Sequence, residues 1–344
     1  MQRKVDRRGP LLDENGKLIE KGYAVSLVRT YDRRAVKASP FRIKEWDYYL
    51  ISDGRRGLAL TVADNAYMGM LSASWLNFEE PCETTSSIMT VMPMGSFHMP
   101  ADSSSGNVSY RDRNIDIAFY SDGKERRLCC TYPGFRNRDT LQAEIILNDV
   151  PQDSMVIMTP YAEDEKAFYY NQKINCMRAS GTVTCGSEKY EFTPDRAFAV
   201  LDWGRGVWTY QNTWYWSSLS ADLDGHRFGF NLGYGFGDTS AATENMLFYD
   251  GRAHKLEDVI FHIPLGSDQK ERFMEPWQFT SSDNRLTMEF VPVIDRASCT
   301  DFKVLRSDQH QVFGNFSGTA VLDDGTVLTF KNLPGFAEKV MNRW

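Results

Sequence analysis

The sequence predicts an all-β protein of two tandem antiparallel barrels or sandwiches with few short helices. Apolar residues recur with a period of two, which sends successive side chains to opposite faces of a strand. The 344 residues include 8 Trp, 16 Tyr and 21 Phe, and such aromatic side chains suit pleated sheets and cavity walls better than helix interiors. Many short strands at regular spacing, without long amphipathic helices, are typical of sandwiches and barrels.

The clearest hairpin is expected over residues 115–132. Apolar and polar residues alternate over 115–119, a Ser-Asp-Gly-Lys turn follows, and the alternation resumes over 128–132. The same pattern predicts further strands over residues 141–147, 228–232 and 286–290. Short helices are expected only after Pro194 and over residues 334–341, because Pro fits a first helical turn without losing a needed donor.

A weak internal repeat divides the chain into two parts. Residues 181–192 and 318–330 share a Gly-Thr start, a Gly-containing turn and a final Phe, at an offset of 137 residues. This offset is about the length of one small β domain. We therefore expect domains at residues 1–195 and 196–344. Two unrelated hairpins with similar turns would give the same pattern.

Charge and hydropathy exclude several kinds of partner. The chain carries 39 Lys+Arg against 46 Asp+Glu, a net charge of -7, so no general positive field is present to bind nucleic acid. No window approaches the run of about 20 apolar residues that a membrane span needs, and no apolar segment follows the charged N-terminus. We expect a cytoplasmic protein whose partner is a small-molecule ligand, and the oligomeric state stays open.

The cysteines and histidines predict neither a disulfide framework nor a metal centre. The six cysteines are sparse and form no C-x-x-C pair, so we expect reduced and mostly buried thiols. The five histidines lack metal-ligand spacing. The glycines of residues 233–237 lack the remainder of a phosphate loop, and G-x-S-x-G is absent. We expect no metal and no cofactor.

The densest candidate functional segment is residues 202–216, which holds four of the eight tryptophans. Large aromatics normally spread through a core, so their concentration here indicates a ligand-binding face. We expect strand alternation from Trp208 onward, so that pairs of rings share a face: Trp208 with Tyr210, and Trp214 with Trp216. Asp202 and Arg205 would enter from a preceding loop that Gly204 and Gly206 allow to turn tightly. The alternative is a core closed by a structural Asp–Arg pair.

A second candidate cluster covers residues 231–255. Asn231, Asp238, Glu244 and Asn245 are expected to line the end of a sheet. Acid/base chemistry needs a carboxyl whose pKa is raised by apolar walls, or two carboxyls in different environments. Asp202 and Glu244 would form such a pair if they share a Trp-lined cavity. Each acid could instead cap a turn or anchor a hydrogen bond.

The N-terminal half offers residues 42–49. Strand alternation places Lys44, Trp46 and Tyr48 on one face and Glu45, Asp47 and Tyr49 on the other. Either face could be a ligand wall. An ordinary charge-paired surface strand would have the same composition.

Residues 202–208, Asp-Trp-Gly-Arg-Gly-Val-Trp, resemble an uncharacterised bacterial family known as domain of unknown function 2804. The resemblance continues at residues 231–233, 237–238, 243–245 and 250–251, and residues 44–48, 335–339 and 342–344 fit as well. More distantly, the Trp-Gly-Arg motif after an acid is similar to the tandem lipocalin-like superfamily of carotenoid 1,2-hydratases, AttH-like proteins and fungal Diels-Alderases. The resemblance implies two calycin-type barrels or half-barrels with a ligand cavity in or between them.

Two hypotheses of function follow. The first is an enzyme that hydrolyses, hydrates or eliminates at a C–O bond of a carbohydrate or other amphipathic substrate, with Asp202 and Glu244 as the catalytic carboxyls. The second is a non-catalytic lipocalin-like binding protein. Buried paired carboxyls favour the enzyme, and a wholly apolar lining favours the carrier. In either case the candidate binding residues are Lys44, Trp46, Asp47, Arg205, Trp208, Tyr210, Trp214, Trp216, Asn231, Asp238 and Asn245.

Overall fold

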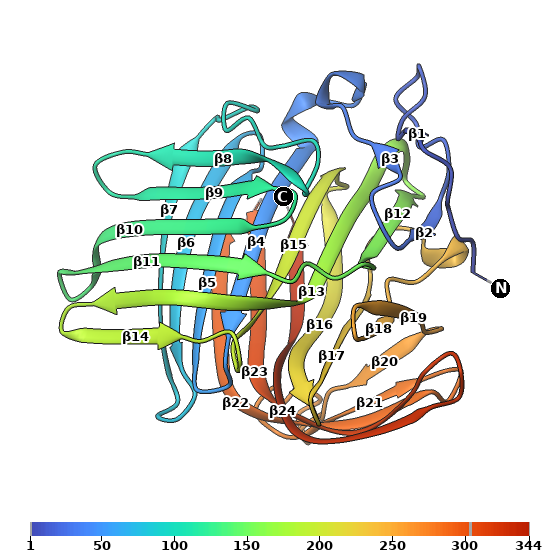
Figure 1. The fold of residues 1–344 in the computed structure, drawn as a ribbon. Coiled ribbons are helices and arrows are strands. Elements are labelled where there is room, and N and C mark those ends of the chain that lie inside the picture. The colour runs from blue at the N-terminus through green and yellow to red at the C-terminus, as the bar shows by residue number, and fades with distance from the viewer. Residues whose placement is uncertain (1, 303–304, 344) are drawn as a thin grey trace.

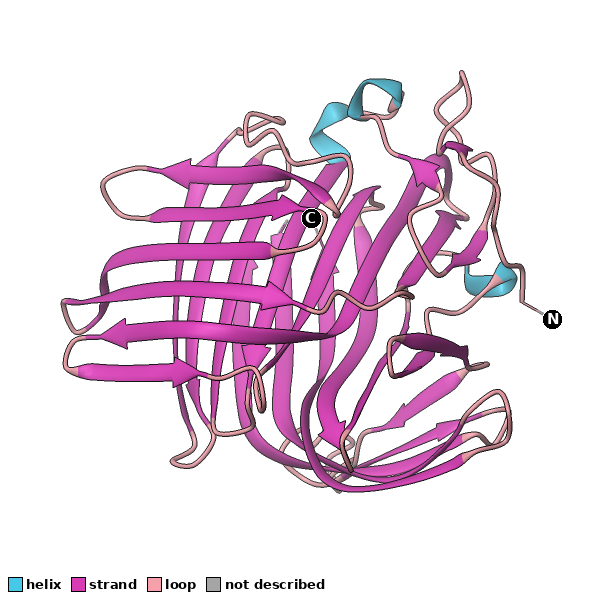
Figure 2. Cartoon of the chain, viewed as in Figure 1, coloured by secondary structure: helices cyan, strands magenta, loops and turns pink. Residues whose placement is uncertain are grey.

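The computed structural model describes residues 2–302 and 305–343 and contains two large antiparallel sheets, each curled into a half-barrel (Figure 1). Figure 2 shows how strongly strands dominate. The helices of the described residues are three 3-10 turns: η1 (Arg33–Ala35), η2 (Pro40–Arg42) and η3 (Thr239–Ala241). The predicted all-β class and the two antiparallel half-barrels are confirmed.

The first sheet has thirteen strands in the order β7-β6-β5-β4-β15-β13-β11-β10-β9-β8, while β12 and β14 pair with β13, and β2 pairs with β12. A separate pair joins β1 (Gly9–Pro10) to β3 (Arg29–Thr30). The strands of the first sheet are β2 (Gly22–Ala24), β4 (Ile43–Ser52), β5 (Arg56–Asp64), β6 (Met68–Asn77), β7 (Cys82–Val91), β8 (Ser105–Arg111), β9 (Asp116–Asp122), β10 (Arg126–Arg136), β11 (Asp139–Asn148), β12 (Met155–Tyr161), β13 (Asp164–Cys185), β14 (Glu188–Phe192) and β15 (Phe198–Val207).

The second sheet has nine strands in the order β19-β18-β17-β16-β24-β23-β22-β21-β20. They are β16 (Gln211–Leu223), β17 (His226–Tyr234), β18 (Met246–Tyr249), β19 (Arg252–Lys255), β20 (Val259–His262), β21 (Trp277–Ser281), β22 (Leu286–Phe302), β23 (Leu305–Val321) and β24 (Val327–Arg343). The chain passes from the first sheet to the second between Val207 and Gln211. A domain division at residue 195 stays a prediction.

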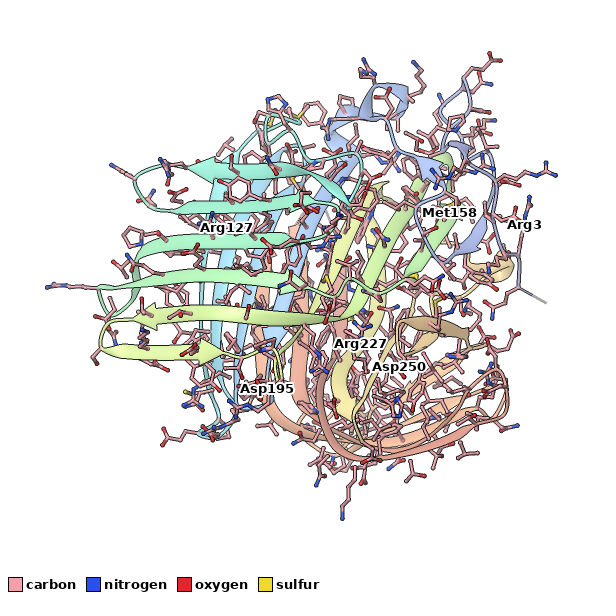
Figure 3. The ribbon with its side chains drawn as sticks, in the orientation of Figure 1. Arg3, Arg127, Met158, Asp195, Arg227 and Asp250 are labelled. Carbon is pink, nitrogen blue, oxygen red and sulfur yellow. The ribbon has the colours of Figure 1, made fainter. Side chains whose placement is uncertain are left out.

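The predicted hairpin and strands are present. Phe119 of β9 lies opposite Leu128 of β10, and the alternating runs of residues 141–147, 228–232 and 286–290 lie in β11, β17 and β22. The two segments of the internal repeat form hairpins with a matching cross-strand pair, because Gly181 faces Phe192 and Gly318 faces Phe330. The Asp250-Gly251 turn joins β18 to β19 (Figure 3).

Both predicted helices are wrong. Residues 194–196 form a turn, and residues 334–341 lie within β24. Ala337 of β24 pairs with Ser217 of β16 and with Val312 of β23, so sheet pairing on both sides overrides the local helix signal. Pro334 is tolerated because the pairing of β24 with β16 ends at Gly335, one residue away.

The cysteines are all free thiols, but the expectation that most of them are buried is only half met. Cys130, Cys176 and Cys185 are buried, Cys129 is partly buried, and Cys82 and Cys299 are exposed. Trp344, which closes the segment that resembles the family, lies outside the described residues. No helix in the described ranges is both long and apolar enough to cross a membrane.

The second half-barrel is filled by aromatic side chains. Its core contains Phe228, Phe230, Trp277, Phe279, Phe290 and Phe316, each essentially inaccessible to solvent. A third, smaller cluster joins the two sheets and includes Tyr48, Leu50, Val200, Trp216, Phe313 and Phe336. We call this interface the seam. Its walls are the facing surfaces of β4, β13 and β15 on one side and of β16, β17 and β24 on the other.

Candidate functional site

Strand β15 divides the buried polar residues into two groups. Because successive side chains of a strand point to opposite faces, Asp202 and Arg205 cannot lie on the same face. Asp202 lies between Tyr48 of β4 and Lys173 of β13 in the register of the sheet. These side chains lie on the seam face. Arg205 lies on the opposite face, inside the first half-barrel.

The expected loop at Asp202 is wrong, and the expected strand begins at Gln211 instead of Trp208, so Trp214 and Trp216 share a strand face but Trp208 and Tyr210 do not. Residues 202–207 belong to β15, and the chain leaves the sheet at Trp208, which is buried, while Tyr210 is 56% exposed. Gly204 lies in a regular strand rather than a turn. A Cβ at this position would fall 2.0 Å from the ring of Trp46, so the glycine makes room for that ring to lie against the strand.

Arg205 is a structural centre of the first half-barrel. Its fully buried guanidinium donates to the backbone oxygens of Trp46 and Pro100, each at 2.7 Å, and lies 3.0 Å from a carboxylate oxygen of Asp47. It also stacks 4.3 Å from the ring of Trp203. The structural Asp–Arg pair considered for this motif therefore exists, but its acid is Asp47 instead of Asp202.

Replacing Arg205 by Lys should destabilise the fold strongly. An ammonium cannot reproduce the planar set of donors that holds β4, β15 and the Pro100 loop together, and the ion pair with Asp47 would be weakened. We expect a loss of about 3–5 kcal/mol in the free energy of unfolding, measured by urea denaturation. The exposed control Arg34→Lys should change it by less than about 0.5 kcal/mol. A loss below about 1 kcal/mol in Arg205→Lys would refute this structural role.

A chain of polar contacts crosses the seam from the first sheet to the second. Asp202 Oδ1 accepts a hydrogen bond from Asn171 Nδ2 at 2.6 Å and lies 2.8 Å from Lys173 Nζ. The Lys173 ammonium is 3.9 Å from the ring centroid of Trp216. Trp216 Nε1 in turn donates to Asn231 Oδ1 at 2.8 Å. The predicted Asp202, Trp216 and Asn231 therefore lie in one buried network.

Glu244 completes this network on the second sheet. Asn231 Nδ2 donates to the Glu244 backbone oxygen at 2.9 Å and to Oε2 at 3.3 Å. The carboxyl lies over Gly233, where a Cβ would come within 2.8 Å of Oε1. Burial raises the pKa of Glu244 to about 7, although Lys173 and the Asn231 hydrogen bond oppose the rise. Near neutral pH this carboxyl can therefore either donate or accept a proton.

A second buried carboxyl, Glu338 of β24, also lies on the seam face. Trp214 Nε1 donates to its Oε1 at 2.9 Å, and Gln311 Nε2 donates to its Oε2 at 3.1 Å. Burial raises the pKa of Glu338. Both carboxylate oxygens of Glu338 thus have donors, whereas Glu244 has one side-chain donor.

Five aromatic rings gather at the end of the seam where the chain crosses between the sheets. We call Trp46, Tyr169, Trp208, Trp214 and Phe236 the aromatic cage. Trp208 packs edge-on against Trp46 and Trp214 with centroids 5.5 and 5.2 Å apart, and Tyr169 stacks on Phe236 at 4.5 Å. Phe236 is flanked by Gly235 and Gly237, whose positive φ values a side chain would disfavour.

The remaining predicted residues have mainly structural contacts. Asp238 caps η3 and pairs with Lys21 at 3.0 Å, which matches the turn-cap alternative. The Asn245 side chain bridges the Gly233 amide and the Glu257 carbonyl, at 2.8 and 3.0 Å. Lys44 lies on the seam face, donates to the Asn65 carbonyl at 3.2 Å, and burial lowers its pKa to about 7.

A cavity of about 90 Å³ lies in the same interface. Its lining includes Leu50, Val200, Ser218 and Phe336. Each of these is two residues along its strand from Tyr48, Asp202, Trp216 or Glu338, and therefore on the same strand face. The cavity continues the seam on the side away from the aromatic cage.

Sequence reasoning missed Tyr169, Asn171 and Lys173 of β13, and gave no role to Glu338. A signal was present, because the polar residues Asn171, Lys173 and Asn175 recur with a period of two in β13 and are all buried. Buried polar residues at this spacing indicate a polar strand face that meets other polar groups. Among the described residues, no group of three or more His, Cys, Asp or Glu side chains is placed to hold a metal ion.

Removing the charge of Glu244 should change how stability depends on pH. The pKa of Glu244 is raised from 4.5 to about 7. Below about pH 4.5 the carboxyl is protonated in both the folded and the unfolded protein, so burying its charge costs no folding free energy there. The cost grows as pH rises and reaches on the order of 3 kcal/mol above pH 7. Glu244→Gln should therefore gain stability relative to the natural protein as pH rises from about 5 to about 7.5.

Chemical denaturation at several pH values measures this effect. The exposed control Glu275→Gln should follow the natural protein throughout. A difference between Glu244→Gln and the natural protein that stays constant across this pH range would contradict the raised pKa of Glu244.

Three solved structures share this fold at low sequence identity. A kievitone hydratase from Nectria haematococca aligns with a TM-score of 0.51 and 11% identity over 88% of each chain. An AttH-type protein from Nitrosomonas europaea aligns with a TM-score of 0.57 and 11% identity over 92% of this chain and 98% of that chain. CghA, in complex with Sch210972, aligns with a TM-score of 0.55 and 11% identity over 97% and 96%.

The family comparison covers nearly the whole chain. No curated protein matches it significantly. The family described as domain of unknown function DUF2804 matches residues 2–344. The resemblance found in the Trp-Gly-Arg segment is thereby confirmed, and the chain belongs to the DUF2804 family.

Proposed function

We propose that this protein is a small-molecule enzyme that uses carboxyl acid/base chemistry at a C–O bond, with Glu244 as the proton donor. The observation that carries the proposal is the fully buried Glu244 carboxyl in the seam, with its pKa raised to about 7. A carboxyl with this pKa is half protonated at neutral pH and is matched to proton transfer there.

Asp202 is the proposed partner of Glu244, as a base or as the anchor of a reacting water. The two carboxyls interact electrostatically, since Asp202 contributes to the raised pKa of Glu244. Their environments differ. Asp202 lies 2.8 Å from the Lys173 ammonium, whereas the Glu244 carboxyl accepts only from the Asn231 amide. When two neighbouring carboxyls have different environments, one can act as the general acid and the other as the general base.

Hydration and elimination fit this arrangement better than hydrolysis. Each needs one proton donor and one acceptor beside a C–O or C=C bond, and the kievitone hydratase of similar fold is by its name an enzyme of this kind. The substrate class is an amphipathic small molecule, with carbohydrates included. Aromatic rings of the cage cover its apolar surface, and seam polar groups hold its oxygens. A cytoplasmic location belongs to the same proposal.

The polar lining of the seam favours the enzyme over a non-catalytic carrier. A carrier for a hydrophobic molecule needs an apolar cavity, but the second half-barrel is filled by its own aromatic core. The seam holds the charged side chains of Lys173, Asp202, Glu244 and Glu338. Burying these groups is costly, and perturbed buried carboxyls in an interface indicate a reactive site.

A ligand screen followed by product analysis tests the proposal. Thermal shift against glycosides, fatty acids, polyenes, hydroxy acids and hydroxy ketones detects binding without any assumption about the reaction. Mass spectrometry of each binding compound then shows whether it gains or loses water or is cleaved. Binding without consumption of any compound would favour the carrier.

Glu244→Gln should lower kcat by on the order of a hundredfold or more, because it removes the proton donor but keeps the shape of the side chain. In the natural protein, kcat/KM should fall about tenfold per pH unit above pH 7 as the acid form is lost. Stopped-flow or steady-state assays across pH 5–9 measure both effects. Glu275→Gln is the matched control, and unchanged activity in Glu244→Gln would refute the assignment.

A further inference from the structure

Two hydrogen-bond donors of the aromatic cage have no acceptor. The Tyr169 hydroxyl and the Trp208 Nε1–H are both buried and lack a hydrogen-bond partner among the described residues. Tyr169 lies opposite Gly206 in the pairing of β13 with β15. A Cβ on Gly206 would lie 3.2 Å from Trp208 Nε1. Both donors therefore lie on the seam face at the same level of the strands.

An unpaired acceptor lies beside these donors. Asn171 is two residues from Tyr169 on the same face of β13, and its Oδ1 has no hydrogen-bond partner in the described part of the chain. Its Nδ2 is held by Asp202 at 2.6 Å, which fixes the direction of the amide. The free oxygen is thus held next to a carboxyl of the proposed acid/base pair.

These three atoms weaken the fold as it stands. A buried polar group without a partner costs about 1–3 kcal/mol, and most buried polar groups in proteins are paired. Burial raises the pKa of Tyr169 far above its ordinary value, so the hydroxyl remains a donor at any physiological pH. The rings of Tyr169 and Trp208 have centroids 6.2 Å apart, and Asn171 lies two residues from Tyr169 on the same strand face. These two buried donors and one buried acceptor define the hydrogen bonds that a ligand must complete.

We propose that the seam binds a β-hydroxy carbonyl compound or the corresponding α,β-unsaturated carbonyl compound. The carbonyl oxygen accepts hydrogen bonds from the Tyr169 hydroxyl and the Trp208 Nε1–H, and the hydroxyl, or the water that replaces it, donates to Asn171 Oδ1. This inference rests on the proposed function, because it names the substrate class of the same site. A carbonyl oxygen accepts two hydrogen bonds and a hydroxyl donates one, which matches the unpaired set.

The groups in the seam can account for every proton and electron pair in the interconversion of the β-hydroxy carbonyl compound and the α,β-unsaturated carbonyl compound. In elimination, the Asp202 carboxylate takes the proton from the carbon next to the carbonyl, the C–H electron pair forms the C=C bond, and the β C–O bond breaks. The leaving hydroxyl takes the proton of Glu244 and departs as water, and the proton gained by Asp202 returns to Glu244 through that water. The negative charge that develops on the carbonyl oxygen is stabilised by the two donors.

A chromophoric enone tests the carbonyl site without any turnover. The p-dimethylamino derivative of benzylideneacetone absorbs outside the protein band, and hydrogen bonds to its carbonyl shift that absorption to longer wavelength. We expect the natural protein to bind it with a red shift. Tyr169→Phe and Trp208→Phe should each weaken binding about tenfold and reduce the shift, whereas the control Tyr120→Phe, on the outer face of the first sheet, should not.

Protein stability separates the loss of a ligand contact from damage to the fold. Because the Tyr169 hydroxyl has no partner, Tyr169→Phe should leave the melting temperature unchanged or higher. A lower melting temperature, a red shift that survives in both variants, or no red shift in the natural protein would overturn the carbonyl site.

Turnover distinguishes this inference from the proposed function. Benzylideneacetone and its water adduct are offered in parallel with β-methylstyrene, which lacks the carbonyl. Hydration of β-methylstyrene at an equal rate would overturn the carbonyl site and leave the acid/base function standing. A red-shifted complex without conversion, in a protein whose Glu244→Gln variant behaves identically, would support the carbonyl site and count against the acid/base function.

Discussion

The buried guanidinium of Arg205 is the contact on which the first half-barrel, and with it the direction of Asp202, depends. It fixes β4 against β15 through the Trp46 carbonyl and closes the first half-barrel through the Pro100 carbonyl. Because strand side chains alternate, holding Arg205 inward turns Asp202 outward to the seam. Two residues of the Asp-Trp-Gly-Arg motif, three positions apart, therefore have different roles. Arg205 stabilises the first half-barrel, and Asp202 faces the second sheet.

The sequence predicted the positions of many strands correctly, but it did not predict that residues 202–206 and 334–341 also belong to strands. Alternation of apolar residues located β9, β10, β11, β17 and β22, because each has one face in a core. Asp202, Gly204 and Gly206 are typical turn residues, and only pairing with β4 and β13 makes them strand residues. Pro334 similarly suggested a helix, but β16 and β23 on either side of the segment impose a strand. Tertiary pairing overrides local propensity at these positions.

The candidate site was predicted only in part for a related reason. Asp202, Trp216, Asn231 and Glu244 stood out by clustering in the sequence, and the fold places them in one network. Lys173 and Glu338 come from strands far away along the chain, so no local pattern could join them to Asp202. Arg205 and Asp47 were expected beside the ligand, but the register of β4 with β15 places them on the opposite face.

The short crossing between β15 and β16 has a mechanical consequence. Only residues 208–210 separate the two strands, so the chain ties the two walls of the seam together covalently at Trp208. About 25 Å farther along the strands, near Val200 and Ser218, Asn175 of β13 donates hydrogen bonds to Ser218 Oγ and to the Leu219 and Phe230 carbonyls, so the two sheets are also tied at that end. The cavity lies at that outer end. The polar residues of the seam therefore lie between a covalent crossing and a set of buried hydrogen bonds, and this limits the small displacements that matter most for reacting atoms.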